Sequence, residues 1–330
     1  SGYMVRPMKI FVTGGAGYIG SICVEQLLEA GHEVVVFDNL TEGHRSAVDP
    51  RAQLVIGDLQ ERAGIAKAVR DAKPTAIMHF AANALVGESM TNPSKYFRNN
   101  VYGGLNLLDA AVEAGVKKFV FSSTCATFGI PERAPIDETL PQRPINPYGE
   151  SKLQFEKMLR WYDEIHSLRY VALRYFNAAG ATGKYGEDHR IETHLIPNVL
   201  KTALGQRTHV EIFGTDYETP DGTCIRDYIH IVDLAQAHMR ALDAEWSALY
   251  NLGTGGGTSV REIIASCERI SGKKITVIEK PRRAGDPARL IAASEKIQRE
   301  LGWVPRFQKI DAIIESAWKW HLAHPHGYGD

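Results

Sequence analysis

The stretch KIFVTGGAGYIG, residues 9–20, decides the fold of this 330-residue chain. Residues 9–13 form an apolar run typical of a buried strand, and Gly15, Gly17 and Gly20 fit the pattern G-x-G-x-x-G. Apolar residues then recur at helical spacing from residue 19 to residue 30, and Gly31 marks the expected end of the helix. Glycines permit a tight turn and let backbone N–H groups approach a pyrophosphate at the positive end of the helix. We therefore expect a strand–turn–helix unit that binds a dinucleotide.

Asp38 identifies the dinucleotide that this turn is expected to hold. It follows the strand-like residues 33–37 and lies downstream of Gly20 at the distance typical of a ribose-binding acid. A carboxylate there accepts hydrogen bonds from an adenosine ribose and repels a 2′-phosphate, which favours NAD over NADP. The alternative for Asp38 is a cap or turn residue. Asp58 follows the strand-like residues 53–56 and is either an adenine contact or a turn aspartate.

Tyr148 and Lys152 indicate proton-transfer chemistry. On a helix, residues four apart share one face, so both side chains reach the same small volume. A lysine ammonium favours phenolate and lowers a tyrosine pKa from its usual value of about 10. Downstream of a dinucleotide turn, we predict that Tyr148 is a general base rather than a packing tyrosine. Thr124 follows the strand-like residues 118–122 and is expected to hydrogen-bond the same substrate oxygen, unless it is a turn or cap residue.

The pattern along the chain predicts an α/β fold. Strands are expected near residues 9–13, 33–37, 53–56, 75–80, 118–122 and 170–175, with helical segments between them, including one from residue 100 to residue 111. This alternation predicts a Rossmann-type doubly wound parallel sheet. After Tyr175 the pattern loosens, with a helix near residues 195–204 and short strands near 210–213 and 249–252. We predict a dinucleotide-binding domain over residues 8–177, with later returns near 226–250, and a smaller mixed C-terminal substrate lobe over 178–330.

Composition narrows the class of protein. The formal net charge of -1 gives no electrostatic reason for binding nucleic acid or membrane. An apolar run near the ~18 residues of a membrane span and a leader with a hydrophobic middle are both missing, so we expect a cytoplasmic chain. The four cysteines are widely separated, which suggests neither a zinc site nor a disulfide framework, and the sequence predicts no metal. Residues 1–7 show no pattern and are left out of the predicted fold.

Taken together, the motifs resemble those of the UDP-glucose 4-epimerases (UDP-galactose 4-epimerases), a family of extended short-chain dehydrogenases/reductases. The similar segments are residues 13–21, 37–40, 79–82, 86–89, 99–100, 173–177, 222–230 and 251–253, and the likeness runs almost end to end. The first segments mark only the superfamily. With the block around Arg226 they indicate nucleotide-sugar epimerases.

The resemblance implies an isomerase that interconverts UDP-galactose and UDP-glucose through bound NAD+ and a 4-keto sugar. Tyr148 would take the O4 proton, Thr124 would orient and relay it, and Lys152 would hold the nicotinamide ribose. The implied cofactor contacts are Gly14, Gly17, Tyr18, Ile19, Gly20, Asp38, Asn39, Asp58, Leu59, Phe80, Ala81, Ala82, Asn99, Ser122, Tyr148, Lys152 and Tyr175. The implied UDP-sugar contacts are Thr124, Asn177, His194, Leu195, Phe213, Arg226, Tyr228, Arg283, Asp286 and Leu290. The family likeness also implies a homodimer.

Four positions depart from the family pattern, and the mildest departure is Thr124, which replaces the serine of many relatives and keeps the hydroxyl. Ala84 replaces a lysine that reaches the cofactor phosphates in many bacterial members, so NAD retention is expected to be weaker unless another basic group substitutes. His194 stands where an asparagine is common near the sugar phosphate, and is either a ligand contact or a structural histidine. Leu290 occupies the position where a bulky tyrosine excludes N-acetylated sugars and a small residue admits them. Leucine is intermediate, which leaves N-acetyl tolerance open.

The sequence leaves four other functions to weigh. A nucleotide-sugar dehydratase needs an acid to expel the C6 hydroxyl, usually an Asp-Glu pair directly after the threonine, but Cys125 and Ala126 follow Thr124 here. A UDP-xylose/UDP-arabinose 4-epimerase is closer, since residues 123–127 and 324–328 also resemble plant enzymes of that kind. A UDP-N-acetylglucosamine 4-epimerase stays possible through Leu290. A non-catalytic NAD sensor is disfavoured, because it has no need of a Tyr/Lys pair.

Overall fold

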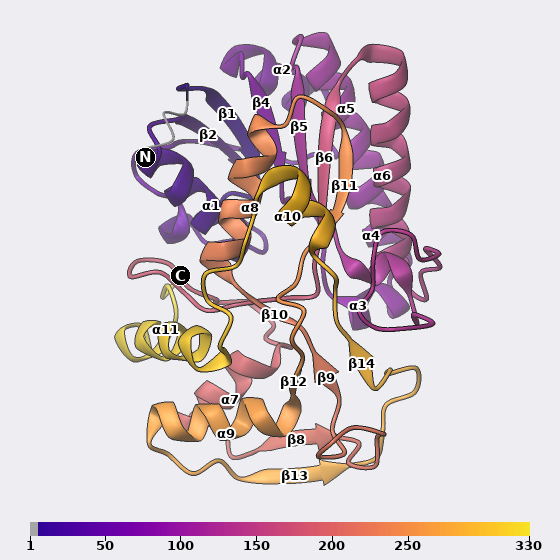
Figure 1. Cartoon of the computed structure of the whole chain (residues 1–330). Coiled ribbons are helices and arrows are strands. Elements are labelled where there is room, and N and C mark those ends of the chain that lie inside the picture. The colour runs from indigo at the N-terminus through magenta and orange to yellow at the C-terminus, as the bar shows by residue number, and fades with distance from the viewer. Residues whose placement is uncertain (1–5) are drawn as a thin grey trace.

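A seven-stranded parallel sheet forms the larger part of the molecule (Figure 1). The computed structural model describes residues 6–330; residues 1–5, part of the segment left out of the predicted fold, lie outside the described residues. In sheet order the strands are β11 (Ala248–Asn251), β6 (Arg169–Arg174), β5 (Lys118–Ser122), β4 (Ala76–His79), β1 (Lys9–Thr13), β2 (Glu33–Asp38) and β3 (Gln53–Ile56). Every neighbouring pair is parallel, and the strand order reverses between β1 and β4. The predicted doubly wound sheet is confirmed.

Helices cover both faces of this sheet, because successive strand residues point to opposite sides. In β1, Ile10 and Val12 belong to a core cluster that includes α1 and α8, whereas Phe11 belongs to a second cluster that includes α2, α5 and α6. These helices are α1 (Tyr18–Glu29), α8 (Ile231–Asp243), α2 (Arg62–Ala72), α5 (Gly104–Glu113) and α6 (Pro147–His166). Figure 1 shows α1 and α8 on one side of the sheet and α5 and α6 on the other.

The helix predicted between the fourth and fifth strands begins as a π-helix, η2 (Phe97–Gly103), and continues as α5. Its two glycines have a packing reason. A Cβ on Gly103 would lie 2.9 Å from the Leu59 Cβ, and one on Gly104 would lie 2.6 Å from the ring of Phe155. Glycine costs helix stability in isolation, but here it lets α6 and the segment after β3 approach closely.

The strand predicted near residues 249–252 lies at the edge of the main sheet as β11, where it pairs with β6. It follows α8, which packs against α1. The chain therefore enters the smaller part of the molecule after β6, returns to complete the sheet, and leaves again.

The smaller part contains three small sheets. They are β8 (Val210–Phe213) with β13 (Val277–Lys280); β12 (Thr258–Ser259), β9 (Ile225–Arg226) and β14 (Arg289–Leu290); and β7 (Asn177–Ala179) with β10 (Tyr228–His230). The other elements are η1 (Arg45–Ala47), α3 (Val86–Thr91), α4 (Pro93–Tyr96), η3 (Cys125–Phe128), α7 (Leu195–Ala203), α9 (Val260–Ser271), α10 (Glu295–Leu301) and α11 (Ile310–Ala323). Helices α7, α9 and α11 share a separate apolar core. Among the described residues, none of the helices combines the length and apolar character that crossing a membrane requires.

Candidate active site

A cavity of about 1200 Å³ lies at the carboxyl ends of the main-sheet strands. Residues at or directly after the ends of β1, β2, β4, β5 and β6 line it: Gly14, Asp38, Phe80, Ser122 and Tyr175. This is the crevice in which doubly wound folds bind ligands. All the residues predicted for the site line this cavity except Asp58.

The glycines of the turn after β1 differ in their surroundings. A Cβ on Gly20 would lie 2.1 Å from the Gly14 carbonyl oxygen, and Gly14 itself has a φ of +74°. Gly17 precedes α1 as its N-cap and faces the cavity, where a Cβ would meet only the Gly14 oxygen at 3.4 Å. Since a glycine N-cap has no side chain, the first N–H groups of α1 are available to a phosphate. This cradle fits the pyrophosphate of NAD.

Asp38 and Asp58 lie in different settings. The Asp38 carboxylate accepts hydrogen bonds from the backbone nitrogens of Ala16 at 3.0 Å and Leu40 at 2.8 Å, at the edge of the cavity. Burial raises its pKa, against the effect of these two hydrogen bonds. The Asp58 carboxylate accepts a hydrogen bond from the Gln60 nitrogen at 2.9 Å and is not among the cavity residues. Its geometry is that of a turn aspartate, the alternative that the sequence left open.

The predicted catalytic side chains meet at the carboxyl end of β5. Tyr148 and Lys152 lie in the first turns of α6 and face the cavity, as their four-residue spacing predicts. Thr124 caps η3, accepts a hydrogen bond from the Ala126 nitrogen at 3.0 Å, and is also hydrogen-bonded to Tyr148. The Lys152 ammonium nitrogen donates to the Ser122 carbonyl oxygen at 2.8 Å.

The expected fall in the Tyr148 pKa is wrong for the protein groups alone. Burial raises the pKa of Tyr148, and the hydrogen bond from Thr124 only partly opposes it. Burial also lowers the pKa of Lys152 to about 7, so this lysine is not a permanent cation near neutral pH. The physical reason is that desolvation penalises both charged forms. A phenolate at Tyr148 therefore needs further positive charge.

A buried ion pair fixes the catalytic strand end to the catalytic helix. Arg174, in β6, donates to the Glu156 carboxylate of α6 through Nε at 3.0 Å and Nη2 at 2.7 Å. The Ser123 hydroxyl donates to the same carboxylate at 2.6 Å. All three side chains are buried. Because Ser123 directly precedes Thr124, this network holds Thr124 in a fixed position relative to Tyr148.

Two arginines face the cavity from the smaller part of the molecule. The Arg226 guanidinium lies 3.0 Å from one Asp286 carboxylate oxygen, and the Arg283 guanidinium lies 3.7 Å from the other. Arg283 also stacks over the Phe213 ring at 4.4 Å. A shared carboxylate thus orients two cationic forks, which are suited to paired hydrogen bonds with a pyrophosphate.

The remaining predicted substrate residues lie on short strands and at the start of α7. Asn177 and Tyr228 are paired across β7 and β10, and Leu290 is paired with Arg226 across β14 and β9. Burial raises the pKa of Tyr228, which therefore stays a neutral phenol. His194 caps the start of α7 ahead of Leu195, and Ala84 lies in the segment before α3; all of them line the cavity.

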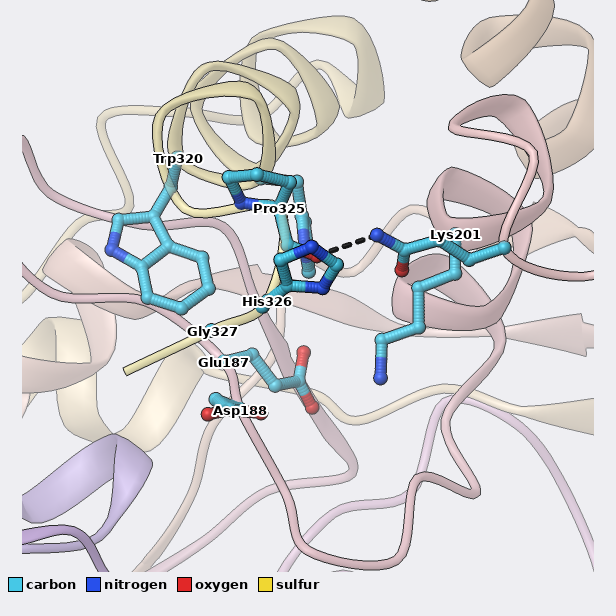
Figure 2. Close-up of a pocket in the computed structure, with 9 residues that line it drawn as sticks. Glu187, Asp188, Lys201, Trp320, Pro325, His326 and Gly327 are labelled. Carbon is cyan, nitrogen blue, oxygen red and sulfur yellow. Dashed lines mark hydrogen bonds between the residues drawn. The ribbon is translucent and has the colours of Figure 1, made fainter. Parts of the chain in front are cut away.

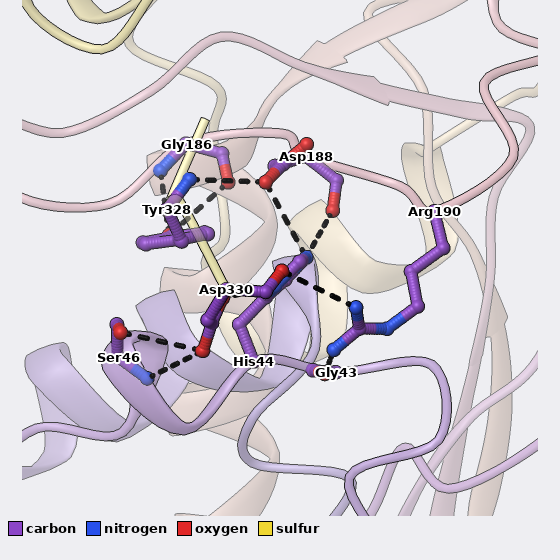
Figure 3. A network of polar contacts seen from close by, with 8 residues as sticks. All are labelled: Gly43, His44, Ser46, Gly186, Asp188, Arg190, Tyr328 and Asp330. Carbon is purple, nitrogen blue, oxygen red and sulfur yellow. Dashed lines mark hydrogen bonds and ion pairs between the residues drawn. The ribbon is translucent and has the colours of Figure 1, made fainter. Parts of the chain in front are cut away.

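The C-terminal residues form a part of the cavity wall that sequence reasoning missed. Figure 3 shows His44 between Asp330 and Asp188, with its ring nitrogens 2.6 Å from an Asp330 carboxylate oxygen and 2.8 Å from the Asp188 carbonyl oxygen. Arg190 donates to the Gly43 carbonyl oxygen at 2.6 Å, and Tyr328 accompanies this network at the cavity. These residues are far apart in the chain, and no local sequence pattern predicts that they are in contact. The contact is therefore visible only in the folded structure.

Comparison with known proteins identifies the family of this chain. A sequence profile of the NAD dependent epimerase/dehydratase family matches residues 10–253. The chain belongs to this family. A curated protein of Lacticaseibacillus casei named UDP-glucose 4-epimerase is 52% identical over 329 residues, which cover 98% of this chain and 99% of that protein. The resemblance predicted from the sequence is confirmed.

Solved structures of the family share the whole fold. The structure of UDP-glucose 4-epimerase from Brucella ovis in complex with NAD superposes with a TM-score of 0.91 at 47% identity, covering 94% of this chain and 97% of that one. The structure of UDP-glucose 4-epimerase from Bifidobacterium longum in complex with NAD+ and UDP gives a TM-score of 0.91 at 38% identity, covering 97% and 99%. NAD is accordingly the cofactor of this chain, in agreement with the glycine turn and Asp38.

Proposed function

We propose that the chain is a UDP-hexose 4-epimerase that interconverts UDP-galactose and UDP-glucose. The observation that carries the proposal is the convergence of Thr124, Tyr148 and Lys152 on one cavity, which also contains the glycine turn and the two arginines. The near-complete length match to relatives named UDP-glucose 4-epimerase supports the choice of hexose. Bound NAD supplies the acceptor that takes hydride from C4 and later returns it.

Tyr148 is the proton carrier in this proposal. As a phenolate, its oxygen takes the proton of the sugar O4 while C4 is oxidised, and gives it back to the 4-keto sugar after the ring has turned its other face. Thr124 hydrogen-bonds Tyr148 and so is in place to orient the same oxygen. Lys152, which donates to the Ser122 carbonyl oxygen, would bind the nicotinamide ribose.

Inversion at C4 requires firm hold of UDP and loose hold of the sugar. We assign the firm hold to Arg226 and Arg283, whose guanidinium groups are oriented by Asp286. The sugar then lies between them and Tyr148, near Asn177 and Leu290, in the cavity that also contains the glycine turn. A sugar held mainly through the pyrophosphate of UDP is free to rotate before the hydride returns.

The size of the Leu290 side chain favours weighing a second candidate function. It lines the cavity from β14, next to Arg226, and its intermediate size neither excludes nor clearly admits an N-acetyl group. A pentose substrate, as in a UDP-xylose/UDP-arabinose 4-epimerase, fits the same catalytic side chains. Elimination of a C6 hydroxyl is disfavoured, because Cys125 is buried next to Thr124 in place of an acid.

The test is conversion of UDP-galactose to UDP-glucose by the purified chain, followed by chromatography of the product mixture. We expect turnover without added NAD if the cofactor stays bound, and stimulation by added NAD if Ala84 weakens its retention. Parallel reactions with UDP-N-acetylglucosamine and UDP-xylose at equal concentration rank the substrates. Unchanged UDP-galactose in the presence of NAD would overturn the proposal.

We further propose a cytoplasmic homodimer that acts in galactose metabolism. Trp161 and Ile165 lie one turn apart on α6 and are 53% and 68% exposed. Tyr102 and Leu105, at the junction of η2 and α5, are also exposed, and both segments contact α6. Such a grouping of large apolar side chains on neighbouring helices suits an isologous interface. The four buried free cysteines suit a reducing compartment.

A further inference from the structure

Four side chains with metal-binding atoms gather in the loop between β7 and α7. They are Glu187, His189, Glu192 and His194, and their ligand atoms all lie within 4.8 Å of one another. One Glu187 carboxylate oxygen is 2.7 Å from the His189 ring nitrogen Nε2 and 2.6 Å from His194 Nδ1. A Glu192 oxygen is 3.6 Å from the same His194 nitrogen. The spacing in the sequence, Glu-x-His-x-x-Glu-x-His, comes together only through the fold of the loop.

Glu192 provides an independent sign of a ligand site. Its side chain is 5% exposed, and its Oε2 atom is buried without a hydrogen-bond partner among the described residues. Its other oxygen already accepts the His194 backbone nitrogen at 2.9 Å. A buried carboxylate oxygen without a hydrogen-bond partner destabilises the folded protein, and a cation bound to that oxygen would offset the destabilisation.

The donor set matches one class of cation. Two imidazole nitrogens and two carboxylate oxygens form an N₂O₂ set, and two carboxylates neutralise one divalent charge. Zn²⁺ binds such ligands at about 2.0–2.2 Å in a tetrahedron, so its ligand atoms lie roughly 3–3.5 Å apart, within the spread of this cluster. Oxygen-seeking Mg²⁺ and Ca²⁺ are poorly served by imidazole.

The cluster borders two cavities of different size. Glu187 and His194 line the large cavity, which gives a cation a route in. On its other side, Glu187 borders a smaller cavity of about 220 Å³ together with Lys201 and His326 (Figure 2). Figure 2 shows that Lys201 lines this smaller cavity with Glu187, and its positive charge disfavours a cation on this second side. We therefore expect entry from the large cavity.

We infer that Glu187, His189, Glu192 and His194 form a binding site for one divalent transition-metal ion, Zn²⁺ first among them. Glu187 and His194 of this site line the substrate cavity, but the site includes none of the catalytic side chains. Bound metal ties the loop between β7 and α7 together, and engages His194, which is also a predicted substrate contact. The inference goes beyond the proposed epimerase activity and does not depend on it.

The test is Zn²⁺ binding to the full-length, untagged chain, measured by competition with a chromophoric chelator. We expect one ion per chain with a dissociation constant in the micromolar range or below. Two variants, His189→Ala and Glu192→Gln, are each expected to weaken binding at least tenfold. His209→Ala is the matched control, because His209 also lies beside a glutamate, at 3.5 Å from Glu211, but with only these two donors. It should bind Zn²⁺ as the unaltered chain does.

Two further measurements keep the outcome clear. Thermal melting without metal shows whether each variant is folded. Histidine ring resonances of the unaltered chain, followed by NMR during the titration, are expected to shift first for two of the 12 histidines. The inference is overturned if the unaltered chain binds no Zn²⁺ below about 100 μM, or if the His189 and Glu192 variants bind it as tightly as the control. Neither result bears on turnover of UDP-galactose.

Discussion

At the scale of single residues, Tyr148 combines two opposing requirements. It must face the cavity to act on a bound sugar, yet burial there raises the pKa of its phenol. Thr124 stabilises the phenolate by a hydrogen bond, but Lys152 is itself buried and its pKa falls to about 7. The protein groups alone therefore leave Tyr148 a weak acid, and bound NAD+ is the remaining source of positive charge.

Replacing Tyr148 tests its role directly. Tyr148→Phe removes the hydroxyl and keeps the ring, so kcat is expected to fall by about 10²- to 10⁴-fold, the usual cost of losing a general base. Affinity for UDP should change little, because the arginines and Asp286 lie on the other side of the cavity. Steady-state kinetics and a UDP titration measure the two effects. Tyr102→Phe, at an exposed tyrosine, is the control and should retain full activity. Lost UDP binding in Tyr148→Phe would make the tyrosine structural.

The charge of the cofactor should be visible in the titration of Tyr148. A nearby cation favours the charged phenolate and lowers the tyrosine pKa, so phenolate should appear at lower pH in the NAD+ form than in the NADH form, whose ring is neutral. The measurement is ultraviolet difference absorbance as pH is raised, with Tyr148→Phe as the blank. Below the lower midpoint neither form should show phenolate. Identical midpoints in both forms would mean that another group ionises Tyr148.

At the scale of elements, two glycines in the turn between β1 and α1 serve different purposes. Gly20 permits close packing, and Gly17 leaves the start of α1 open to the cavity. Alanine is favoured over glycine inside helices by about 1 kcal/mol. At Gly20, however, a Cβ would lie 2.1 Å from the Gly14 oxygen, so Gly20→Ala is expected to lower stability by ~1–3 kcal/mol. At Gly17 the nearest atom would be 3.4 Å away, so Gly17→Ala should fold normally.

The same pair of variants tests the cofactor cradle. The Gly17→Ala methyl group would enter the cavity at the start of α1, so NAD affinity should drop at least tenfold while the melting temperature is kept. Gly20→Ala should melt earlier even without NAD. Thermal melting and NAD titration distinguish the two effects. A Gly17→Ala variant with unchanged NAD affinity would move the pyrophosphate away from this turn.

Local patterns predicted the elements well where the cause is local. The strands β1 to β6 follow from apolar runs, and the facing of Tyr148 and Lys152 follows from helical spacing. The Tyr148 pKa was mispredicted because it depends on burial, which no spacing reveals. Asp58 matches a strand-end pattern, but its side chain closes a turn onto Gln60.

At the scale of the whole molecule, prediction failed where distant segments meet. The cluster from Glu187 to His194 lies in a stretch whose pattern is only that of a loop, and the neighbouring Gly186 and Asp188 hydrogen-bond to Tyr328 near the other end of the chain. The pairing of His44 with Asp330 likewise joins opposite ends of the sequence. Such contacts depend on the complete packing of both parts, and not on any one segment.

The proposed dimer also concerns the whole molecule, and substitutions on the exposed face of α6 test it. Trp161→Glu combined with Ile165→Glu places two carboxylates on the exposed apolar face, where burial against a second copy would leave both charges unpaired. We expect the variant to be monomeric in sedimentation or light scattering while the unaltered chain is dimeric. Val304→Glu is the control, since Val304 is 58% exposed and lies outside these helices; it should stay dimeric.

A double variant that remains dimeric would place the interface elsewhere, and a monomeric unaltered chain would refute the dimer itself. Because the cavity is lined within one chain, we expect the monomeric variant to bind UDP as well as the control does.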